Sequence, residues 1–218
     1  MYNKNKIVIF DWGGVIESHY ENEYNWYTAI SNIVRHFSIL TNKEEIIEKY
    51  FLCDYDELGK SIIEYNEMED VKKWFIRLKN EFNFNCSFEE FCEVYQKEFS
   101  KLDYYKDIVL LAHSLKENCK IGILSNLMCW DKKRLDKQVN LKEFDYVWLS
   151  FEMGHKKPDE GIYECVEKEC NISPNNILFI DDNEENINAA KKRGWNVCLA
   201  TGHELDKIKD SVNKFINT

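Results

Sequence analysis

Proline and glycine are scarce in this sequence, at only 2 and 8 of its 218 residues. So small a share excludes a collagen-like chain and a long flexible linker. With 44% hydrophobic and 31% charged residues, the composition is instead typical of a compact globular protein rich in regular structure. The length suits one packed core with a subsidiary domain, because domains usually contain roughly 100 to 200 residues.

Long apolar runs are also missing. No stretch reaches the roughly 18 apolar residues that a helix needs to cross a bilayer. The apolar run near the N-terminus stops at Asp11 after four residues, far short of the core of a signal peptide. We therefore expect a soluble, cytoplasmic protein with no membrane partner.

Basic residues are outnumbered, 29 against 39 acidic residues, so the formal net charge is -10. Binding to nucleic acid draws its affinity from clustered Lys and Arg, so we expect no nucleic-acid partner. Paired cysteine motifs are missing too. The eight cysteines form no CxxC motif and most lie in apolar runs, which predicts free, buried thiols.

Short apolar runs that end in acidic or small residues recur along the chain. They span residues 7–10, 121–124, 146–150, 177–180 and 197–200. Runs of this length are typical of strands that are buried on both faces of a parallel sheet. Helical patterns lie between them, so we expect an α/β fold with a Rossmann-like parallel sheet flanked by helices. Ligands of such sheets bind beyond the carboxyl ends of the strands.

Three helices of this core can be predicted from local signals. Apolar residues at helical spacing run from Ile108 to Leu115, and Ser173 with Pro174 fits the start of a helix. Another helix should follow Asp182 and end at Gly194.

Residues 17–100 break the alternation because they show only helical periodicity. Ser87 with Glu90, and Thr41 with Glu44, fit capping boxes at helix starts. We expect an all-helical lid domain over residues 17–100, inserted into a core formed by residues 1–16 and 101–218. Its place directly after the first strand favours a lid over a purely structural subdomain.

Polar residues follow the predicted strands in a definite order. Asp11 comes after the first strand, Ser125 and Asn126 after the second, Lys157 before a helix, and Asp181 with Asp182 after a later strand. Each is a weak signal alone, because such residues are common at strand ends and in loops. Their order is similar to that of the haloacid dehalogenase superfamily, whose four motifs are a nucleophilic Asp, a Ser or Thr, a Lys and an acidic pair. The resemblance covers essentially the whole chain, with the helical insert in the position of the superfamily's lid.

The resemblance implies a phosphoryl-transfer site. Asp11 would be the nucleophile, and Asp11, the Gly13 carbonyl, Asp181 and Asp182 would hold Mg²⁺, a cation that prefers oxygen ligands. The phosphoryl group would be bound by Ser125, Asn126 and Lys157, of which Ser125 and Lys157 would be catalytic with Asp11. Trp12 is the aromatic residue best placed to contact substrate, and Asn186 would brace the acidic loop.

One position departs from the superfamily's pattern. Its phosphatases usually carry a second Asp two positions after the nucleophile, where it protonates the leaving group, and here that residue is Gly13. General acid catalysis contributes roughly 10²- to 10⁴-fold to the rate. The FDWGGVI segment is similar to that of the α-glucose-1-phosphatase-like branch, which also lacks this Asp. The acid would then come from elsewhere, with Glu17 and His19 as candidates, or the leaving group would need no acid.

Two alternatives stay open. Asp11-Trp12-Gly13-Gly14 is also similar to the Asp-Trp-Ala-Gly of phosphonoacetaldehyde hydrolases, which need a lid lysine such as Lys43, Lys49 or Lys60. Cleavage of a carbon-halogen bond belongs to the same alternative, although its metal-free chemistry would leave the acidic pair uncompensated. The other alternative is a non-catalytic binding protein. No role is assigned to His113 or His155.

We expect a Mg²⁺-dependent phosphatase that acts on a small phosphorylated metabolite, most plausibly a sugar phosphate. The partner is then a small phosphate ester, and the protein a monomer or weak homodimer.

Overall fold

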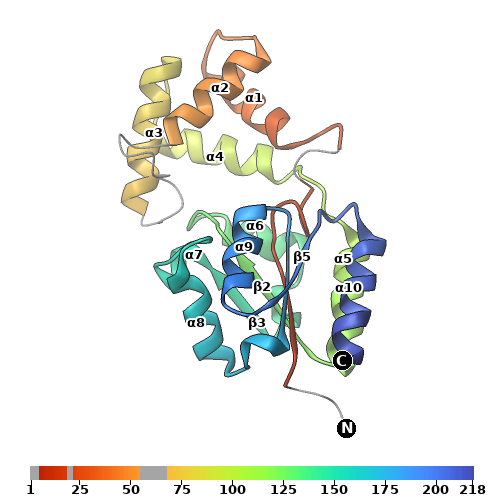
Figure 1. Cartoon of the computed structure of the whole chain (residues 1–218). Coiled ribbons are helices and arrows are strands. Elements are labelled where there is room, and N and C mark those ends of the chain that lie inside the picture. Colours follow the sequence, from red (N-terminus) through yellow and green to blue (C-terminus); the bar gives the residue numbers. More distant parts are fainter. Residues whose placement is uncertain (1–4, 19–21, 55–67) are drawn as a thin grey trace.

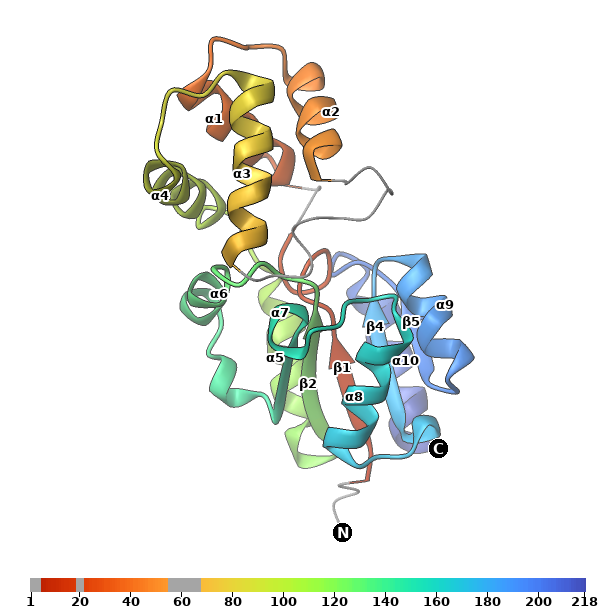
Figure 2. The same cartoon turned by 90° about the vertical axis from the view of Figure 1, so that its left-hand side faces the viewer.

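The computed structural model describes residues 5–18, 22–54 and 68–218. In the view of Figure 1, a sheet flanked by helices forms the lower body and a group of helices lies above the carboxyl ends of its strands, and the turned view of Figure 2 shows the same arrangement. Within the described residues, none of the helices combines the length and the apolar character needed to cross a membrane.

A parallel sheet of five strands forms the centre of the core, in the order β3-β2-β1-β4-β5. The strands are β1 (Ile7–Phe10), β2 (Lys120–Ser125), β3 (Tyr146–Leu149), β4 (Ile177–Asp181) and β5 (Asn196–Leu199). The predicted fold class and all five strands are confirmed. The third strand ends one residue early, because Ser150 begins a short helix.

Helices cover both faces of this sheet. They are α5 (Lys106–Ser114), α6 (Lys132–Gln138), α7 (Ser150–Met153), α8 (Glu160–Cys170), α9 (Glu184–Lys192) and α10 (Leu205–Asn217). Side chains of α5, α6 and α10 pack with Val8 and Phe10 on one face, whereas α8 and α9 pack with Ile7 and Ile9 on the other. Figure 1 shows α5 and α10 side by side. The strand period of two therefore gives β1 two buried faces.

Two of the three predicted core helices form. The pattern from Ile108 lies in α5, and α9 begins after Asp182 and is followed by Gly194 at a φ of 88°. The helix predicted to start at Ser173 and Pro174 is wrong, because only a single 3₁₀ turn, Pro174–Asn176, forms there. The chain enters β4 at the next residue, so the sheet ends the helical conformation after one turn.

The lid consists of α1 (Trp26–Phe37), α2 (Lys43–Asp54), α3 (Met68–Phe82) and α4 (Phe88–Phe99). The predicted capping box of Ser87 and Glu90 is present at the start of α4. The box predicted from Thr41 is wrong, because the side chain of Asn42 instead accepts the Glu45 N–H at 2.9 Å. Asn42 is one residue closer to the first turn, where a side-chain oxygen reaches the free N–H groups.

The lid and the core meet along the two linkers and one core loop. Ser18 N–H donates to Asp103 O at 2.9 Å and Tyr105 N–H to Ile16 O at 2.8 Å, so the linkers run antiparallel. The loop after β2 also joins the lid, because Met128 is buried in the lid's apolar cluster and the ring of Trp130 stacks on Phe88. The domain boundaries at residues 16 and 101 stay a prediction.

Candidate active site

Neighbouring strands bring the predicted site residues to one edge of the sheet. Asp11 follows β1, and Ser125 and Asp181 end the two strands that flank it, β2 and β4. The Asp11 N–H donates to Ile180 O at 2.9 Å, which continues the hydrogen-bond ladder between β1 and β4 as far as Asp11. All three side chains are buried. The topology therefore gathers side chains that lie far apart in the sequence.

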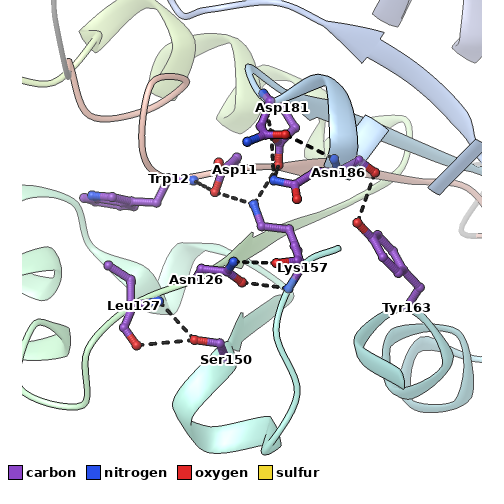
Figure 3. Close-up of polar contacts among 10 residues, drawn as sticks. Asp11, Trp12, Asn126, Leu127, Ser150, Lys157, Tyr163, Asp181 and Asn186 are labelled. Carbon is purple, nitrogen blue, oxygen red and sulfur yellow. Dashed lines mark hydrogen bonds and ion pairs between the residues drawn. The ribbon is translucent and has the colours of Figure 1, made fainter. Parts of the chain in front are cut away.

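Lys157 lies at the centre of this group, on the loop between α7 and α8. Its Nζ is 2.8 Å from Asp11 Oδ1 and 2.6 Å from Asp181 Oδ2, as Figure 3 shows. Burial lowers the pKa of Lys157, but the two carboxylates raise it by more, so that the net shift is upward. The side chain is therefore cationic at neutral pH.

The acidic groups outnumber this single cation. Asp11, Asp181 and Asp182 offer carboxylate oxygens that all lie within 4.8 Å of one another. Burial raises the pKa of Asp11 to about 7, with Asp181 and Asp182 adding to the rise and Lys157 opposing it. Three carboxylates beside one ammonium leave an excess of negative charge that a divalent cation would neutralise. The donor set, all oxygen, fits Mg²⁺.

Both carboxylate oxygens of Asp181 accept hydrogen bonds. Oδ1 accepts from Asn183 N–H at 2.8 Å, and the Asn186 side-chain amide is 3.1 Å from both carboxylate oxygens. Oδ2 also accepts from Lys157. Both oxygens of Asp181 are therefore held by neighbouring groups, and its metal role, like those of Asp11 and Asp182, stays a prediction. Asn186 does contact the acidic loop in the way predicted for it.

Asp182 lies against the loop that follows Asp11. Gly14 has a φ of 72°, and a Cβ atom there would lie only 2.2 Å from Asp182 Oδ2. A glycine at this position therefore serves both the left-handed backbone and the close approach of the carboxylate. The adjacent Gly13, predicted to offer its carbonyl, lies in the same loop and is half-buried.

Asn126 holds the Lys157 loop through both atoms of its side-chain amide. Its Nδ2 donates to Lys157 O at 2.8 Å, and its Oδ1 accepts the Lys157 N–H at 2.9 Å. Substrate binding by Asn126 stays a prediction, and its side-chain amide holds the Lys157 loop in this structure. Ser125, directly before it, is 2% exposed at the end of β2.

One contact beside the site was missed from the sequence, and one predicted residue is buried. Tyr163 OH donates to Asn186 O at 3.0 Å, which ties α8 to α9 behind Asp181. Trp12 is fully buried in the core, and its indole points away from Lys157 (Figure 3). Substrate contact by Trp12 therefore stays a prediction, and this structure leaves no surface of its side chain exposed. The apolar neighbours Phe10 and Val15 were the signal for a core position.

The candidate replacement acids fare differently. Glu17 is 1% exposed, and its carboxylate is paired with the guanidinium of Arg134. His19 lies outside the described residues, as does Lys60. Lys43 and Lys49 contact lid residues, Thr28 in the first case and Glu45 with Glu81 in the second.

Comparison with known proteins identifies the family. The family described as haloacid dehalogenase-like hydrolase matches residues 8–200. The chain therefore belongs to the haloacid dehalogenase-like hydrolases, and the resemblance expected from the four motifs is confirmed.

Two curated relatives are phosphatases. A D-ribitol-5-phosphate phosphatase of Bacteroides thetaiotaomicron is 23% identical over 202 residues, which cover 87% of this chain and 89% of the relative. An enolase-phosphatase E1 of a Sulfurihydrogenibium species is 31% identical over 107 residues, or 48% of this chain and 42% of that protein.

Solved structures share the fold. A haloacid dehalogenase family enzyme of Bacteroides thetaiotaomicron, in complex with magnesium and inorganic phosphate, has a TM-score of 0.67 at 21% identity and covers 91% of this chain and 96% of its own. An L-2-haloacid dehalogenase of Xanthobacter autotrophicus has a TM-score of 0.63 at 20% identity, with coverage of 90% and 76%. The likeness therefore extends to enzymes with different names and does not by itself select a substrate.

Proposed function

We propose that this hydrolase is a Mg²⁺-dependent phosphatase that acts on a small phosphorylated metabolite through an aspartyl-phosphate on Asp11. The observation that carries the proposal is the pairing of Lys157 with Asp11 and Asp181 beside a third carboxylate, Asp182. This arrangement would supply a nucleophile, a fixed cation and a place for a divalent ion within one site, whose Asp11 and Asp181 are buried and whose Asp182 is half-buried. A phosphoryl group needs all three, because it is anionic and resists attack.

The residues take distinct roles in this reaction. A carboxylate oxygen of Asp11 attacks phosphorus, and the bond to the leaving oxygen breaks with its electron pair on that oxygen. Water then attacks the phosphorus of the aspartyl-phosphate, which releases inorganic phosphate and restores the carboxylate. Lys157 would offset the charge on nucleophile and phosphate, and Ser125 would donate a hydrogen bond to a phosphoryl oxygen.

The metal would be held by the Asp11 and Asp182 carboxylates and the Gly13 carbonyl, with Asp181 in support through its contacts. When bound, Mg²⁺ supplies positive charge at the phosphoryl oxygens. The phosphatase names of two relatives, and the magnesium and phosphate bound to a structural neighbour, agree with this assignment.

The leaving group is expected to be a good one. Gly13 supplies no acid, and Glu17 is bonded to Arg134 and so is poorly suited to donate a proton. A substrate whose leaving oxygen carries negative charge easily, such as the anomeric oxygen of a sugar 1-phosphate, needs no such donor. Metal-free carbon-halogen cleavage is less well supported, because the three carboxylates would lack a neutralising cation. Carbon-phosphorus cleavage is less well supported, because both candidate lysines that the structure describes, Lys43 and Lys49, contact lid residues.

Phosphate release tests the proposal. We expect turnover of p-nitrophenyl phosphate and of sugar 1-phosphates with Mg²⁺, little turnover of sugar 6-phosphates, and none in EDTA. Asp11→Asn should be folded and inactive, since an amide does not serve as the nucleophile. The same substitution at Asp145 is the matched control. The Asp145 carboxylate accepts the Ile121 N–H near the start of β2, away from the site, so Asp145→Asn should keep its activity. Wild-type activity in Asp11→Asn would refute the proposal. So would the absence of phosphate release by the wild-type protein from every phosphate ester tested.

A further inference from the structure

Three charged side chains are buried together at the junction of core and lid. Arg134 on α6 pairs with Glu17 at the end of the loop that follows β1, and its Nε is 3.4 Å from Asp131 Oδ1. The exposed fractions of Arg134, Glu17 and Asp131 are 4%, 1% and 3%. None of these residues has a part in the proposed chemistry.

Glu17 closes the loop that carries the nucleophile. Its N–H donates to Trp12 O at 2.7 Å, and its carbonyl accepts the Gly14 N–H at 2.9 Å. The loop therefore has Asp11 at one end and Glu17 at the other, with main-chain hydrogen bonds between. Because the Glu17 side chain is bonded to Arg134, the position of this end of the loop depends on α6.

The same helix also contacts the lid side of the junction. The Arg134 guanidinium lies 5.8 Å from the ring centre of Phe99, the last residue of α4. One turn further on, Gln138 Nε2 donates to Leu102 O at 2.9 Å in the returning linker. Arg134 is thus the point at which the nucleophile loop, the lid helix α4 and the core helix α6 meet.

We propose that Arg134, together with Glu17 and Asp131, is a positioning device that sets the nucleophile loop relative to the lid. The inference rests on the proposed function for its effect on catalysis. Buried ion pairs are often no more stable than apolar residues of similar volume, so stability alone does not account for three buried charges here. A directional pair fixes one loop conformation, whereas an apolar contact tolerates several, and a misplacement of about 1 Å in a site can lower the rate roughly 100-fold.

The test uses Glu17→Leu in the full chain. This variant removes the contact to the loop and leaves Arg134 paired with Asp131, so that no charge is stranded. We expect hydrogen exchange of the Gly14, Ile16 and Tyr105 amides to speed up about tenfold, with exchange of the β1 amides unchanged. Turnover of p-nitrophenyl phosphate with Mg²⁺ should show kcat lowered at least about tenfold and KM changed less than about twofold.

A second variant guards against a folding defect. Glu17→Gln/Asp131→Asn/Arg134→Met neutralises the whole group, and we expect its melting temperature to be close to that of the wild type while exchange and kcat remain altered. Arg193→Met is the control, because Arg193, directly after α9, also binds several carboxylates, but these lie along α8 away from the nucleophile loop: Glu160, Glu164 and Glu167. It should keep wild-type exchange in the nucleophile loop and wild-type kcat.

Wild-type exchange of the loop amides in a folded Glu17→Leu or neutralised variant would overturn the proposal. The exchange measurement needs no turnover, so it tests the positioning role even if the wild-type protein hydrolyses none of the phosphate esters. Failure of the proposed function and failure of this inference are therefore seen in different experiments.

Discussion

The Nζ atom of Lys157 lies 2.8 Å from Asp11 Oδ1 and 2.6 Å from Asp181 Oδ2, so one buried ammonium serves two buried carboxylates. Lys157→Met should leave both acids unpaired and lower the free energy of unfolding by about 3 to 5 kcal/mol. It should also lower kcat at least about 100-fold, since a fixed charge at the reacting group is lost. Urea denaturation and phosphate release measure the two effects.

Exposed Lys168 on α8 is the control for this substitution. Lys168→Met should change the free energy of unfolding by less than about 0.5 kcal/mol and leave kcat unchanged. Full activity in Lys157→Met would remove this residue from the site.

Substitution of Gly14 is expected to lower the affinity for Mg²⁺. Gly14 and Gly154 both have positive φ, 72° and 66°, so alanine at either position should cost about 1 kcal/mol of stability. At Gly14 the new Cβ would meet Asp182, whereas at Gly154 it would have no atom of the described residues within 4 Å beyond its chain neighbours. We therefore expect Gly14→Ala, and not Gly154→Ala, to weaken Mg²⁺ binding by about 10- to 100-fold in calorimetry. Equal affinities in the two variants would contradict a metal role for Asp182.

Substitution of Asn126 is expected to lower activity, because its side chain holds the main chain of Lys157. Asn126→Ala leaves a partly buried N–H and C=O without their partner, which should cost about 1 to 3 kcal/mol of stability and lower kcat through misplacement of Lys157. Asn126→Asp keeps the acceptor alone and should lie between alanine and wild type. Asn140, which bonds Lys142 N–H away from the site, offers the control Asn140→Ala. Unchanged kcat in Asn126→Ala would show that the Lys157 loop holds its position without the clamp.

The buried carboxyl of Asp131 should make the free energy of unfolding depend on pH. Burial raises the pKa of this carboxyl from 3.8 to about 6, with Arg134 opposing the rise and Glu17 adding to it, and buried Tyr95 lies nearby. The folded protein therefore holds the proton more tightly than the unfolded chain. This contribution to stability is complete below about pH 3.8 and is lost as the pH rises through about 6.

The loss should be at most about 3 kcal/mol in the free energy of unfolding. Asp131→Asn cannot titrate, so the difference between wild type and variant should change in this interval and be flat above about pH 7. Urea denaturation from pH 4 to pH 8 measures it. A difference that does not vary with pH would show that the carboxyl titrates at its ordinary value.

Much of the fold was predictable because its signals are local. The five apolar runs are short and end in polar residues, and a parallel sheet aligns the carboxyl ends of its strands at one edge. Asp11, Ser125 and Asp181 consequently meet in the structure as the sequence predicts. The capping box at Ser87 was predictable for the same reason, since both partners lie within one turn.

The errors arose where neighbouring elements compete for the same residues. Ser173 and Pro174 carry a valid helix-start signal, but β4 begins at Ile177 and leaves space for one turn only. Thr41 fits a capping pattern, yet the next residue takes the cap. Substrate contact by Trp12 stays a prediction, and the structure buries this side chain in the core cluster.

The sequence by itself determined the family, the order of the motifs along the chain and the types of residue at the site, because these follow from local pattern and composition. Only the tertiary structure decided that Asn126 clamps Lys157, that Asp181 is bonded through both oxygens, and that Arg134 pairs with Glu17. The last two residues are 117 positions apart. Periodicity reports which face of an element is buried, but the partner of a buried polar side chain depends on how distant elements pack.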